Sequence, residues 1–70
     1  MSESLTWEST YAIALELKRA HTGIDMESVT LGNVHEWTLA LENFDDDPAL
    51  VNDEILSAIY KDWYEEILHE

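Results

Sequence analysis

The spacing of apolar residues along the chain predicts three helices joined by short loops. In residues 9–20, the apolar side chains of Ile13, Leu17 and Ala20 recur at helical intervals, so they should form one buried stripe. We expect this first helix to end near Gly23, because glycine readily adopts the left-handed conformation that closes a helix.

The middle of the chain predicts an extended segment followed by a short helix. Residues 28–31 are partly β-branched and alternate in polarity, which is typical of an extended segment or a very short strand. Asn33 is a good N-cap for a second helix, with Val34, Trp37 and Leu41 on one face. We therefore expect a second helix that begins just after Asn33.

A third helix is expected to supply the centre of the core. Asn52 can cap it, and Asp53 and Glu54 fall in its first turn, where negative charge is favoured. Its apolar stripe consists of Ile55, Leu56, Ile59, Trp63 and Ile67. The predicted fold class is mainly α, a small three-helix domain of helix-turn-helix or reduced winged-helix layout with minimal β structure.

Aromatic side chains outside this stripe have predicted structural roles as well. Trp37 is spaced to enter the core, as Trp63 is. Trp7 lies outside the helical stripes, and we expect it to seal the edge of the core. Phe44 is expected to anchor the loop that follows the second helix.

Length and cysteine content restrict the function classes. Seventy residues suffice for one domain, which we expect to span residues 1–70 with a core at about 5–67. Apolar residues make up 46% of the chain, which is too many for a disordered acidic tail. Cysteine is absent, so disulfides, thiolate metal sites and cysteine catalysis are excluded.

The charge favours a basic protein as the partner. Sixteen Asp and Glu residues oppose three Lys and Arg residues, giving a formal net charge of −13. Such a surface repels nucleic acid and anionic membranes, attracts basic protein surfaces, and favours a monomer through self-repulsion. Neither a leader segment nor an apolar run of the ~20 residues that span a membrane is visible, so we expect a cytoplasmic protein.

The most acidic stretch is the expected loop from Asn43 to Pro48, which contains the aspartate triplet Asp45–Asp47. Three successive carboxylates repel one another, and a cation or a basic cluster relieves this repulsion. The alternative is a solvated loop whose aspartates only favour the following helix. The predicted partner-binding face consists of Glu42, Asp45, Asp46, Asp47, Asp53 and Glu54.

Metal binding and catalysis receive weaker support from the residues. Oxygen ligands alone predict weak, transient metal binding, with non-specific condensation of counter-ions as the alternative. The candidate metal residues are His35, Glu42, Asp45, Asp46 and Asp47. No nucleophile motif or glycine-rich phosphate cradle is present, so we name no catalytic residue and expect a protein that is not an enzyme.

Several motifs together resemble one family. Leu5-Thr6-Trp7, His35-Glu36-Trp37, and the run from Leu41 to Pro48 with the later Asn52 and Ile55-Leu56 are similar to the IscX family, small acidic accessory proteins of iron–sulphur cluster assembly. The resemblance runs without gaps from about Leu5 to Glu66. Its most specific element is Phe-Asp-Asp-Asp-Pro followed at fixed offsets by Asn and Ile-Leu.

The resemblance implies a modified winged-helix fold and binding to the cysteine desulfurase IscS. The basic IscS surface concerned is also used by bacterial frataxin and ferredoxin, so competition with both is implied. The resemblance further implies weak binding of ferrous or ferric iron, no tightly bound cofactor, and a regulatory role in cluster assembly. Two alternatives are an iron carrier that donates metal to the assembly complex and a generic acidic protein-interaction module.

Overall fold

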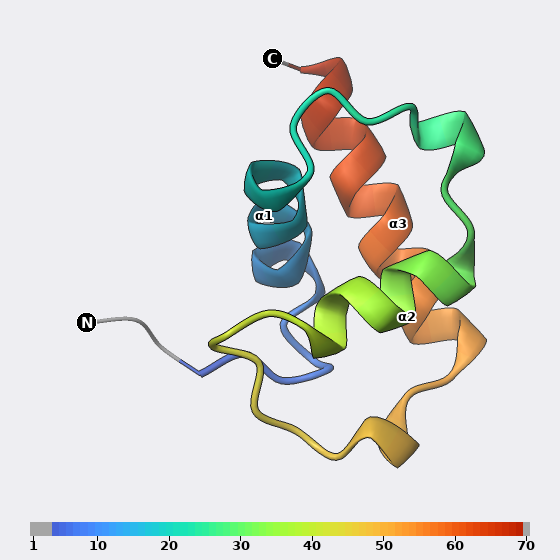
Figure 1. Cartoon of the computed structure of the whole chain (residues 1–70). Coiled ribbons are helices and arrows are strands. Elements are labelled where there is room, and N and C mark those ends of the chain that lie inside the picture. Colours follow the sequence, from blue (N-terminus) through green and yellow to red (C-terminus); the bar gives the residue numbers. More distant parts are fainter. Residues whose placement is uncertain (1–3, 70) are drawn as a thin grey trace.

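Three α-helices and two single-turn 3₁₀ helices make up the fold (Figure 1), which a computed structural model describes for residues 4–69. In chain order they are α1 (Thr10–Ala20), η1 (Met26–Ser28), α2 (Leu31–Leu39), η2 (Pro48–Leu50) and α3 (Asp53–Leu68). Within the described residues, β structure is limited to an isolated parallel bridge between Leu5 and Phe44. The predicted mainly α, three-helix fold with minimal β structure is therefore confirmed.

The first helix ends where the sequence predicts. Gly23 has a φ of 80°, in the left-handed region, and lies three residues after the end of α1 at Ala20. Ile13 and Leu17 are buried as expected, but Ala20 is exposed. Helical spacing gives the direction of a side chain, whereas its burial depends on whether another segment covers it.

The second helix begins three residues earlier than expected, because Thr30 and not Asn33 is its N-cap. The Thr30 hydroxyl accepts a 3.1 Å hydrogen bond from the Asn33 backbone N–H, and the Asn33 side-chain oxygen accepts one of 3.1 Å from the Thr30 N–H. This reciprocal pair is a capping box, in which the third helical residue supports the cap. Of the predicted extended segment 28–31, only Val29 and Thr30 are extended, because Ser28 ends η1 and Leu31 begins α2. These two residues form no strand with any described residue.

The third helix agrees with the sequence at its start and on its buried face. The Asn52 side-chain oxygen accepts a 2.8 Å hydrogen bond from the backbone N–H of Ile55, which confirms the predicted cap. Leu56, Ile59 and Trp63 are buried, so α3 supplies the centre of the core as expected.

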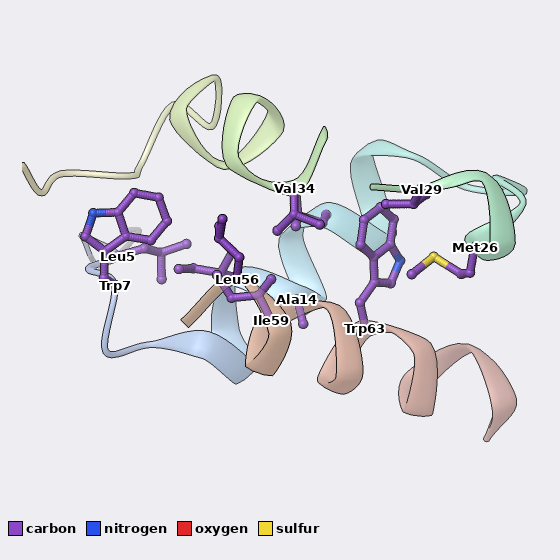
Figure 2. Close-up of a cluster of buried hydrophobic side chains, with 11 residues drawn as sticks. Leu5, Trp7, Ala14, Met26, Val29, Val34, Leu56, Ile59 and Trp63 are labelled. Carbon is purple, nitrogen blue, oxygen red and sulfur yellow. The ribbon is translucent and has the colours of Figure 1, made fainter. Parts of the chain in front are cut away.

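The core forms one continuous layer between the helices (Figure 2). Leu5 and Trp7 lie at one end of it, and Trp63, Met26 and Val29 lie at the other. Its largest fully buried side chains are Ile13, Leu17, Val34, Thr38, Ile59 and Trp63. The predicted burial of Trp7 is confirmed, since only 2% of it is exposed.

Trp37 differs from the other two tryptophans. It is half-buried at the edge of the core, where its ring stacks on His21 with the ring centroids 4.3 Å apart.

No helix of the described part is long and apolar enough to cross a membrane.

Candidate protein-interaction surface

The segment from Glu42 to Glu54 joins α2 to α3 and runs along one end of the molecule, the lower edge in Figure 1. We call this segment the acidic end, because it contains six carboxylates and no Lys or Arg. All six residues predicted to bind a partner belong to it by sequence. The fold keeps them at this end, away from η1 and the last turns of α3.

The amino-terminal segment holds the acidic end in place through backbone pairing. The Leu5 N–H donates a 2.8 Å hydrogen bond to the Asn43 carbonyl oxygen, and the Asp45 N–H donates one of 2.8 Å to the Leu5 carbonyl oxygen. Trp7 packs edge-on against Phe44, with ring centroids 4.6 Å apart. Phe44 is thus half-buried at the base of the loop, in agreement with its predicted anchoring role.

Two carboxylates of the aspartate triplet are used within the fold. The Asp46 carboxylate accepts hydrogen bonds from the backbone N–H groups of Trp7, at 3.1 Å, and Asp47, at 2.8 Å. The Asp47 carboxylate accepts a 2.9 Å bond from the Ala49 N–H and so caps η2. The solvated-loop alternative is therefore partly right, because these two side chains stabilise the local structure.

Five of the six acidic residues of the acidic end are exposed: Glu42, Asp45, Asp47, Asp53 and Glu54. Within residues 4–69, the Asp45 carboxylate forms no hydrogen bond or ion pair. The chain's three Lys and Arg residues lie elsewhere, two in the last turn of α1 and one in α3. The acidic end therefore has no Lys or Arg of its own to neutralise it, and its field extends into solvent.

The sequence matches a known family over most of its length. A family model described as "Iron-sulphur cluster assembly" covers residues 5–68. The chain belongs to this family. The resemblance to IscX proteins is thereby confirmed, which places the protein's role in iron–sulphur cluster assembly, in a family of accessory proteins not known as enzymes.

A relative supports the same grouping. An uncharacterised protein of Pseudomonas aeruginosa is 32% identical over 63 residues, which cover 90% of this chain and 96% of that protein. The similarity thus extends over nearly all of both chains.

The candidate iron ligands of this IscX-family protein are not gathered into a site. Among residues 4–69, no group of three or more His, Asp or Glu side chains is arranged to hold a metal ion. His35 lies in α2 and faces Trp7, with ring centroids 6.0 Å apart. Its Nε2 atom is buried without a hydrogen-bond partner in the described part of the chain. Weak association of iron with single exposed carboxylates stays a prediction.

Two features of the acidic end were not predicted from the sequence. One is the short helix η2, which leaves the Leu50 side chain 61% exposed. The available signal was the Asp-Pro pair at its start, since proline is favoured in the first turn of a helix. The other is the pairing of Leu5 and Trp7 with the loop, for which the local sequence contains no signal.

Proposed function

We propose that this protein docks through its acidic end onto a basic surface of the cysteine desulfurase IscS and thereby regulates iron–sulphur cluster assembly. The observation that carries the proposal is the exposed Asp45 carboxylate, which forms no hydrogen bond or ion pair within residues 4–69 and belongs to the same segment as four other exposed acidic residues. Frataxin and ferredoxin would compete for the same basic surface. Membership in an assembly family supports a partner within that machinery.

Electrostatic attraction explains how such an encounter works. A single-sign patch with no counter-charge steers a basic partner from a distance and raises the association rate at low salt. The Debye length falls from about 10 Å at 0.1 M ionic strength to about 3 Å at 1 M, so salt weakens this steering. We therefore expect the affinity for the desulfurase to fall as sodium chloride is raised.

A charge-reversal pair tests the location of the dock. Glu42→Lys with Asp45→Lys changes two exposed carboxylates outside the α-helices, and the control pair Glu27→Lys with Glu65→Lys changes net charge equally at η1 and late in α3. Biolayer interferometry with purified desulfurase should show strong loss of binding for the first pair and little for the control. Equal losses would indicate a bulk charge effect and contradict a localised dock.

Iron carriage is the alternative role for the same carboxylates. Because the described side chains form no multidentate cluster, iron would be held by one or two carboxylates and water, and this binding would be weak. Anaerobic titration with ferrous iron in excess magnesium separates the two possibilities. Iron binding that survives magnesium would favour a carrier, and loss of the signal would indicate condensation on the acidic end.

A further inference from the structure

A small apolar surface lies within the acidic end. Pro48, Ala49 and Leu50 form η2, and all three are exposed, Leu50 by 61%. The exposed carboxylates Asp45 and Asp53 lie on either side of η2 in the chain. An apolar centre with a charged rim is the typical anatomy of a protein–protein interface.

The turn that carries Leu50 is held in a defined conformation. The Leu50 N–H donates a 3.0 Å hydrogen bond to the Asp47 carbonyl oxygen, and the Asp47 carboxylate accepts from Ala49. The same Asp47 carbonyl oxygen accepts a 2.8 Å bond from Trp7 Nε1, which ties the turn to the core. A side chain presented on an ordered turn loses little conformational freedom on binding, so its burial contributes more to affinity.

Charge determines what kind of surface can cover Leu50. A second copy of this chain would bring its own acidic end close, and a net charge of −13 on each copy opposes that contact. A basic protein surface suits the rim, and an apolar recess within that surface suits the Leu50 side chain.

We infer that Leu50 is the apolar centre of the docking surface and inserts into a recess ringed by Lys and Arg on the partner. The inference rests on the proposed function and adds a division of roles to it. The carboxylates speed the encounter, and Leu50 slows dissociation, because buried apolar contacts act mainly on the off-rate.

Substitutions at Leu50 test this division with purified desulfurase. Leu50→Ser should raise the off-rate about ten-fold, as expected for a residue among the minority whose truncation weakens an interface clearly, and leave the salt dependence of the on-rate unchanged. Leu50→Met should bind like the wild type, because it keeps an apolar side chain of similar size. Leu68→Ser is the matched control, since Leu68 is 67% exposed at the carboxyl end of α3, and it should have no effect.

The possible outcomes separate this inference from the proposed function. If Leu50→Ser binds like the wild type while Glu42→Lys with Asp45→Lys fails, the acidic dock stands and the role of Leu50 is wrong. If the wild type does not bind the desulfurase, the proposed function fails and the inference fails with it. Sedimentation of the free protein covers the remaining case: dimers lost in Leu50→Ser would mean that a second copy covers this surface, which overturns the inference.

Discussion

The indole Nε1 of Trp7 donates a 2.8 Å hydrogen bond to the backbone carbonyl oxygen of Asp47, which lies forty residues further along the chain. The Trp7 backbone N–H also donates to the neighbouring Asp46 carboxylate, at 3.1 Å. One buried residue therefore fixes both the path of the acidic loop and the turn that presents Leu50. Stability and partner binding are expected to be coupled through Trp7.

Replacing Trp7 by Phe should lower the free energy of unfolding by about 2–3 kcal/mol, because the smaller ring leaves a void and the Asp47 carbonyl oxygen loses one of its two hydrogen-bond donors. Urea denaturation followed by circular dichroism measures this loss. Trp37→Phe is the control: Trp37 is only half-buried, so its truncation should cost less. Equal losses in the two variants would show that Trp7 has no special role.

Asp46 and Asp45 should differ in their contribution to stability, although each substitution by Ala removes the same charge. Asp46→Ala removes an acceptor of two backbone N–H groups and should destabilise the protein by about 1–2 kcal/mol. Asp45→Ala should change stability by less than about 0.5 kcal/mol, because this carboxylate is exposed. Urea denaturation of the two variants measures their free energies of unfolding. A greater loss of stability in Asp45→Ala than in Asp46→Ala would refute the structural role given to Asp46.

Thr38→Val should leave stability unchanged or raise it by about 1 kcal/mol. Thr38 is fully buried, and its Oγ1 atom has no hydrogen-bond partner among the described residues. A buried hydroxyl without a partner costs about 1–3 kcal/mol, whereas a methyl group in its place costs nothing in desolvation. Thr10→Val is the control and should destabilise, because the Thr10 hydroxyl donates to Asp62 at 3.2 Å. A clear loss in Thr38→Val would contradict the prediction.

The Tyr11 phenol should titrate above its ordinary pKa of 10.0, because the negative charge of Glu66 and a hydrogen bond to its carboxylate both disfavour the phenolate. Because the pKa is raised in the folded state, the interaction of the neutral Tyr11 phenol with Glu66 stabilises the protein. This stabilisation is fully present below the unfolded pKa of about 10 and is lost as pH rises through the folded pKa. Glu66→Gln should therefore lower the Tyr11 pKa, measured from the pH dependence of its ring NMR signals. An unchanged pKa in that variant would rule out Glu66 as the cause.

The sequence by itself determined the features that depend on neighbouring residues. Asn52 caps α3 by bonding the N–H of Ile55, and Gly23 takes the left-handed conformation just beyond the end of α1, both within a few residues of the chain. The buried stripe of α3 was also predictable, because helical periodicity directs its apolar side chains to one face. The start of α2 was not, since Thr30 and Asn33 are both competent caps and act here as a reciprocal pair.

For the candidate surface, the sequence determined the sign of the charge and its concentration between Glu42 and Glu54. Only the tertiary structure decided that Asp46 and Asp47 serve as hydrogen-bond acceptors within the fold, while Asp45 and Leu50 face solvent. The physical reason is that the roles of these similar aspartates depend on Trp7, and a contact across forty residues forms only once the core has brought both segments together.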